Sequence, residues 1–147
     1  MSFNLDFFNA AIYNAKDIVS NPGIFGKNKK QILIVCNNFE KAEIADFLTK
    51  IMSAVNTDLQ EDTSILNLKE TDSISWSALV NSTKPEKVIF FGVEPARLGL
   101  HLKLLKYQLV KWAEINILAS DSLEEIIADK NKKSMLWREL QILFAKV

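Results

Sequence analysis

The feature that most constrains the fold is an unbroken apolar run, Val88–Phe91. A strand that faces water on one side alternates apolar and polar residues, and this run does not alternate. The run therefore predicts a strand covered on both faces, as in a parallel sheet. Gly92 and Pro95 end it. The loop that follows leaves the carboxyl end of the strand, where open α/β sheets usually place their ligand sites.

Other segments extend this pattern into a layered α/β domain. A second buried strand is predicted at residues 32–36, and helical spacing of apolar residues predicts a helix over 39–55. Further strands are expected at 64–68 and 115–119, and a helix at 71–82. Residues 107–112 also have an extended pattern, and residues 56–63 are interpreted as a loop. Together these segments predict a three-layer α/β/α sandwich with a mainly parallel sheet of about four strands.

The two ends of the chain are predicted to be helical. Residues 3–19 carry an apolar stripe, which packs on the body of the protein or else binds a partner. Residues 24–30 contain glycine and lysines and are interpreted as a linker. We expect a single domain, residues 1–147, from which the helix and linker of residues 1–28 can separate. At the other end, Ser122 and Glu125 form a capping-box pattern, residues 129–133 break the helix, and a last helix starts at Ser134.

Composition and charge point to a cytoplasmic protein. The 18 basic and 18 acidic residues cancel, so no overall charge directs the chain to nucleic acid or to a membrane. The single cysteine, Cys36, excludes an internal disulfide and fits a reducing compartment. The N-terminal region lacks the pattern of a signal peptide, and no run approaches the roughly 18 apolar residues of a membrane span.

The sequence contains no recognisable catalytic set. The glycines, at positions 23, 26, 92 and 99, cannot assemble a phosphate loop, so no cofactor is predicted. One histidine and one cysteine give no paired metal-ligand spacing, so no metal site is predicted. Cys36 ends a buried strand and is interpreted as a core residue. No residue is therefore assigned a catalytic role.

Polar residues nevertheless gather where predicted strands end. The candidate pocket consists of Asn37, Asn38, Glu94, Arg97, Asp121 and Ser122. Structural roles compete with this interpretation, because Glu94 can pair with Arg97 and because helix capping explains Asp121 and Ser122. A small hydrolase or transferase that uses Glu94, Arg97 and His101 is a further alternative, which requires these three side chains to converge.

The C-terminal segments Ser122-Leu-Glu-Glu125 and Lys133-Ser-Met-Leu-Trp-Arg-Glu-Leu-Gln-Ile-Leu-Phe144 resemble the ending of the psi subunit of bacterial DNA polymerase III. The predicted strands at 32–36 and 87–92 and the helix through 47–55 follow the order of that family. The resemblance covers about residues 31–144, and its most specific part is Leu136-Trp137. It implies a non-enzymatic protein with a uracil-DNA-glycosylase-like fold.

The resemblance also implies partners. Psi subunits dock their N-terminal segment on the clamp loader, and their body binds the chi subunit, which reaches single-strand-binding protein. Carried onto this chain, it implies partner binding by Phe7, Phe8, Ile12 and Tyr13. Trp137 joins these candidate partner-binding residues on its own chemistry, because tryptophan and arginine are favoured anchors of interfaces. Trp137 is otherwise a core residue, and an exposed part of it would indicate an interface. The expected function is a non-catalytic protein-interaction subunit of a DNA replication assembly.

The glycosylase-like fold supplies the alternative of a degenerate domain that binds a base or nucleic acid. In that alternative Asn38, Asp121 and Ser122 surround the pocket. Asn38 stands where one branch of glycosylases uses asparagine to position water. The glycine and proline of that turn and the histidine of the last loop are absent here, so base excision is not expected. Direct binding to nucleic acid is left open by the sequence.

Overall fold

The computed structural model describes residues 23–69 and 72–145. Its centre is a six-stranded mixed sheet with the order β1-β3-β2-β4-β6-β5. The strands are β1 (Ile24–Phe25), β2 (Ile32–Cys36), β3 (Thr63–Asn67), β4 (Lys87–Phe91), β5 (Leu109–Trp112) and β6 (Ile115–Ser120). Strands β3, β2, β4 and β6 are parallel, whereas β1 and β5 are antiparallel at the two edges.

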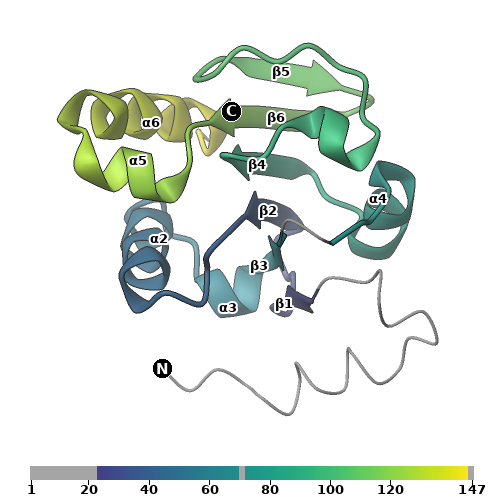
Figure 1. The fold of residues 1–147 in the computed structure, drawn as a ribbon, viewed down its shortest axis with the longest axis horizontal. Coiled ribbons are helices and arrows are strands. Elements are labelled where there is room, and N and C mark those ends of the chain that lie inside the picture. The colour runs from purple at the N-terminus through teal and green to yellow at the C-terminus, as the bar shows by residue number, and fades with distance from the viewer. Residues whose placement is uncertain (1–22, 70–71, 146–147) are drawn as a thin grey trace.

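Helices cover both faces of this sheet (Figure 1). They are α2 (Ala42–Ala54), α3 (Leu59–Asp62), α4 (Trp76–Thr83), α5 (Leu123–Ala128) and α6 (Lys130–Leu143), with a 3-10 helix, η2 (Pro95–Leu98). Helices α2, α5 and α6 pack on one face, and α4 and η2 pack on the opposite face. The α/β class is therefore confirmed. No helix in residues 23–69 and 72–145 has the length and apolar character needed to cross a membrane.

The central strand β4 shows why its sequence does not alternate. Ile89 and Phe91 belong to the core beneath α2, α5 and α6, whereas Val88 and Phe90 belong to the core beneath α4. All four are fully buried. Because both faces exclude water, both sets of side chains are apolar, as the sequence predicted.

The expectation of about four mainly parallel strands is wrong, because an antiparallel strand is added at each edge of the sheet. One of these, β1, corrects the interpretation of residues 24–30 as a linker. Ile24 pairs with Leu66, and the Lys27 and Lys29 amides donate to the carbonyl groups of α3 at 2.8 and 2.9 Å. A strand of two residues is too short for any periodicity to reveal. The predicted helix 3–19, with Phe7, Phe8, Ile12 and Tyr13, lies outside the described residues.

Two further predictions are corrected at helix starts. The predicted loop 56–63 contains α3, whose first turn is capped by Asp58 through hydrogen bonds from the Gln60 and Glu61 amides. The predicted break at residues 129–133 is confined to Asp129, because α6 already begins at Lys130. Asp129 caps this helix by accepting from the Asn131 and Lys132 amides. In both cases an aspartate starts a helix instead of ending one.

The topology places a switch point between β2 and β4. The connection through α2 leads from β2 to β3 on one side, and the connection through α4 then crosses to β4 on the other side. Loops that leave neighbouring parallel strands in opposite directions open a crevice at the carboxyl ends of those strands. This end of the sheet is therefore the first place to look for a site.

Candidate functional site

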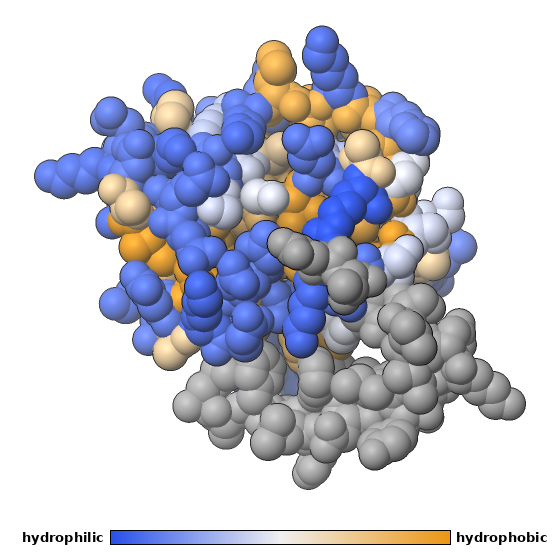
Figure 2. All heavy atoms as spheres, viewed as in Figure 1, coloured by the Kyte–Doolittle hydropathy of each residue, from blue (hydrophilic) through white to orange (hydrophobic). Residues whose placement is uncertain are grey.

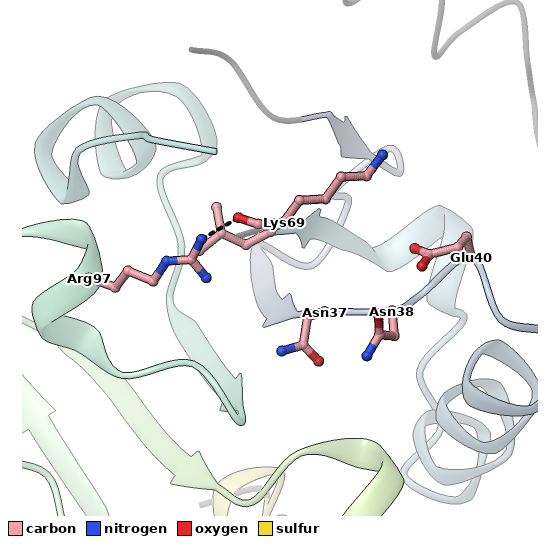
Figure 3. Close-up of a pocket in the computed structure, with 6 residues that line it drawn as sticks. Asn37, Asn38, Glu40, Lys69 and Arg97 are labelled. Atoms are coloured by element: carbon pink, nitrogen blue, oxygen red, sulfur yellow. Dashed lines mark hydrogen bonds between the residues drawn. The ribbon is translucent and has the colours of Figure 1, made fainter. Parts of the chain in front are cut away.

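A cleft of about 250 Å³ lies at the carboxyl ends of β2, β3 and β4 (Figure 3). Residues that follow three different strands line it: Asn37, Asn38 and Glu40 after β2, Leu68 and Lys69 after β3, and Arg97 after β4. The cleft thus occupies the switch point of the sheet.

The structure brings three of the predicted pocket residues together and leaves three out. Asn37, Asn38 and Arg97 line the cleft, whereas Glu94, Asp121 and Ser122 do not. Sequence reasoning missed Glu40, Leu68 and Lys69. Lys69 could have been found by the rule that selected Asn37, because it follows the carboxyl end of a buried strand in the same way.

Arg97 reaches across the cleft from η2. Its Nη2 group donates to the main-chain carbonyl of Lys69. Within the described residues, no ion pair joins Arg97 to Glu94, so the salt bridge considered from the sequence is not formed. His101 is exposed, and in the same ranges no hydrogen bond joins it to Glu94 or Arg97. The convergence that a hydrolase alternative requires is therefore not observed.

Asn38 is engaged with helix α5. It adopts a positive φ of 59°, which asparagine tolerates in turns. Its Nδ2 group donates to Glu124 Oε1 at 2.7 Å, and Lys41 Nζ lies 3.0 Å from Glu124 Oε2. The hydrogen bonds from Lys41 and from Asn38 lower the pKa of Glu124. These contacts tie the turn after β2 to the start of α5.

Glu40 is held at the far end of the cleft from Arg97 (Figure 3). Asn67 Nδ2 donates to Glu40 Oε1 at 2.9 Å, and the Phe39 amide donates to Asn67 Oδ1 at 3.2 Å. The hydrogen bond from Asn67 lowers the pKa of Glu40, and the charge of Lys69 adds to this effect. The carboxylate therefore stays charged and fixed in position.

Asp121 belongs to a separate cluster. Its side chain is only 7% exposed, and it accepts hydrogen bonds from Lys106 Nζ at 2.7 Å and from Tyr107 OH at 2.8 Å. Lys132 Nζ of α6 lies 3.6 Å away. Burial alone would raise the pKa of Asp121, but the hydrogen bonds from Lys106 and Tyr107 and the nearby lysine charges lower it. Asp121 thus binds lysines and does not cap a helix, contrary to the interpretation from the sequence.

Ser122 does cap a helix, as the capping-box pattern predicted. The Glu125 amide donates to Ser122 Oγ at 3.2 Å, and Ser122 Oγ donates to Glu125 Oε1 at 3.1 Å. Cys36 is fully buried, and burial raises the pKa of its thiol to about 12. A thiol with this pKa stays protonated at neutral pH, as expected for a core residue. The described ranges contain no group of three or more metal-ligating side chains placed to hold an ion.

Helix α6 presents a different kind of candidate site. Leu136, Leu140 and Leu143 are buried against the sheet. Trp137, next to Leu136, is 38% exposed, and Ile142 is 55% exposed. The Leu-Trp pair that carries the resemblance is therefore divided between the core and the surface.

Comparison of the sequence with protein-family models gives no match. Comparison with curated proteins gives none either. The two candidate sites, the cleft and the exposed face of α6, therefore rest on the geometry described above.

Proposed function

We propose that this protein is a non-catalytic interaction subunit of a DNA replication assembly, comparable to the psi subunit of DNA polymerase III, and that it acts through the exposed face of α6. The observation that carries this proposal is the position of Trp137. Leu136 is 0% exposed and anchors the helix, whereas the adjacent Trp137 is 38% exposed. Tryptophan and arginine are the side chains that most often dominate the energy of protein interfaces, and the exposed Arg138 follows Trp137 directly.

The contacts at the carboxyl edge of the sheet also support a binding role. Asn38 is bonded to Glu124, Glu40 to Asn67, and Asp121 to Lys106 and Tyr107. A general acid or base has to reach a proton on its substrate, and side chains that hold the protein's own segments together serve structure first.

The partners proposed are those that the resemblance implies. A chi-like subunit would bind the body of the protein through α6 and link it to single-strand-binding protein. The clamp loader would bind the N-terminal segment through Phe7, Phe8, Ile12 and Tyr13, which lie outside the described residues.

Affinity capture of the tagged full chain from its native cells tests the proposal, with mass spectrometry of the recovered proteins. Wild-type protein is expected to recover clamp-loader subunits, a chi-like subunit and single-strand-binding protein. Trp137→Ala is expected to lose the chi-like subunit and keep the clamp loader. A Phe7→Ala, Phe8→Ala double variant is expected to show the reverse pattern.

Trp112→Ala is the matched control for Trp137→Ala. Trp112 is 36% exposed, but it contacts Trp76, which lies in the core on the α4 side of the sheet, opposite α6. Its replacement is expected to leave recovery unchanged. Equal recovery by the Trp137→Ala variant, or no replication protein recovered by the wild type, would contradict the proposal. Binding of uracil-containing DNA by the wild type without such partners would favour the glycosylase-like alternative.

A further inference from the structure

We infer that the cleft at the switch point binds a phosphoryl group, held by the guanidinium of Arg97 and the side-chain amide of Asn37. This inference is independent of the proposed function, which places partner binding on α6. It rests on the place of the cleft in the fold, on the donors that face it and on the balance of charge along it.

Arg97 is held in place while most of its donors stay available. A guanidinium carries five N–H donors in a planar fork that matches phosphate oxygens. Arg97 has one side-chain hydrogen bond in the described residues, to the carbonyl of Lys69. A carbonyl orients the guanidinium without neutralising it, and no carboxylate of residues 23–69 or 72–145 forms an ion pair with it, so the charge can pair with an anion.

Asn37 supplies an uncharged donor that lines the same cleft. It follows β2 directly, and Figure 3 shows it between Arg97 and Asn38. In residues 23–69 and 72–145 its side chain makes no hydrogen bond with another side chain or with the main chain. The amide of Asn38, by contrast, is already bonded to Glu124.

The charges along the cleft are ordered. The guanidinium of Arg97 lies at one end and the carboxylate of Glu40 at the other (Figure 3). Glu40 already accepts from Asn67, and the charge of Lys69 acts on it. An anion is therefore favoured at the Arg97 end, and a hydroxyl or amino group of the same ligand is favoured at the Glu40 end. At about 250 Å³ the cleft is near the lower limit for small-molecule sites, which favours a phosphate monoester over a dinucleotide.

A titration followed by NMR on the ¹⁵N-labelled full chain tests the inference, with inorganic phosphate and then thymidine 5′-monophosphate as probes. Ionic strength is held constant with chloride. Saturable shifts are expected at the amide signals of Asn37, Asn38 and Lys69 and at Arg97 Nε. Non-saturating shifts, or equal shifts with chloride or acetate, would overturn the inference.

Arg97→Gln is expected to weaken phosphate binding about tenfold, the loss typical of one charge-assisted hydrogen bond. Lys111→Gln is the matched control, because Lys111 is an exposed cation on the edge strand β5, away from the cleft and from α6. It should bind phosphate as the wild type does. Equal binding by the two variants would refute the site, provided that their urea unfolding midpoints agree with the wild type.

A second comparison distinguishes a free nucleotide from a DNA end as the source of the phosphate. Thymidine 5′-monophosphate is compared with oligothymidine that carries or lacks a 5′-phosphate. Tighter binding of the mononucleotide indicates a free metabolite, and tighter binding of the phosphorylated strand indicates a DNA end. If the unphosphorylated strand binds as well as either, the site does not recognise a phosphate monoester. Arg97→Gln should still recover the replication partners, so failure of this inference is distinguishable from failure of the proposed function.

Discussion

The buried carboxylate of Asp121 joins segments that are distant in the chain. It follows β6, and it binds Lys106 and Tyr107 from the preceding loop and Lys132 from α6. Burial and the hydrogen bond to Asp121 raise the pKa of Tyr107, so the phenol remains a donor at neutral pH. Asp121 therefore fixes the position of α6 relative to the sheet.

Asp121→Asn is expected to destabilise the protein by about 2 kcal/mol at pH 7, because it removes the charge from these hydrogen bonds. The pKa of Asp121 is lowered in the folded state. Its contribution is therefore present above the unfolded pKa of about 4 and is lost as pH falls through the folded pKa. Urea unfolding at pH 7 and near pH 3 should show a difference between variant and wild type that shrinks in acid.

Glu114→Gln serves as the control for this pH dependence. Glu114 is 91% exposed and pairs only with Lys111, at 3.6 Å, among the described residues. Exposed pairs of this kind contribute little to stability. The same urea midpoint for Asp121→Asn and wild type at pH 7 would contradict the structural role of Asp121.

Gly92 and Gly99 have similar backbone conformations but differ in how closely other atoms surround them. Both have positive φ, 72° and 81°. A Cβ at Gly92 would lie 2.7 Å from Ser122 Cα, whereas a Cβ at Gly99 would have no neighbour within 4 Å. Gly99→Ala should cost about 1 kcal/mol for backbone strain alone, and Gly92→Ala about 2 to 4 kcal/mol because overpacking is added. Equal urea midpoints for the two variants would contradict this assignment.

Within helix α6, different residues are expected to contribute to stability and to partner binding. Leu136→Ala should lower the free energy of unfolding by about 2 to 5 kcal/mol, because it leaves a cavity at a fully buried position. Trp137→Ala should lower it by less, about 1 to 2 kcal/mol, because the side chain is only partly covered by its own chain, and it should reduce partner recovery. Urea unfolding together with affinity capture measures both effects. A large loss of stability in Trp137→Ala would show that the residue serves the core.

The long buried strands could be predicted from the sequence because they are covered on both faces. The apolar runs of β2 and β4 are short and rich in β-branched or aromatic residues, which favours buried strands over helices, and in β6 Asn116 and Ser120 are the only polar residues. The elements that the sequence missed are short. Strand β1 has two residues, and α3 has four, of which only Leu59 is buried. Such elements are fixed by contacts with β3 that no local pattern records.

The candidate sites also contain some residues that the sequence predicted and others whose roles depend on tertiary contacts. Asn37, Asn38 and Arg97 could be predicted to meet because the carboxyl ends of parallel strands lie at one edge of a sheet. Asp121 was misplaced because its role depends on where the loop through Lys106 and Tyr107 runs. Similarly, the exposure of Trp137 depends on the angle at which α6 packs. A helical pattern identifies the buried stripe but does not settle a residue at its border.

In the molecule as a whole, the two candidate sites are built from different elements of the same α/β fold. The cleft is built from loops at the switch point, and the exposed face of α6 is built on a helix anchored by three buried leucines. The space-filling view shows a largely hydrophilic face with limited hydrophobic areas (Figure 2). Four large apolar side chains of the described residues are exposed, Leu105, Trp112, Trp137 and Ile142, and of these Trp137 and Ile142 both lie on α6.

Hydrogen exchange followed by mass spectrometry tests the central claim most directly. The full chain is compared free and in the purified complex with the chi-like subunit recovered by capture. Peptides that cover α6, residues 130–143, are expected to exchange more slowly in the complex, while peptides over the turn at 37–41 stay unchanged. Protection confined to the cleft, or no added protection along α6, would contradict an interface built on Trp137.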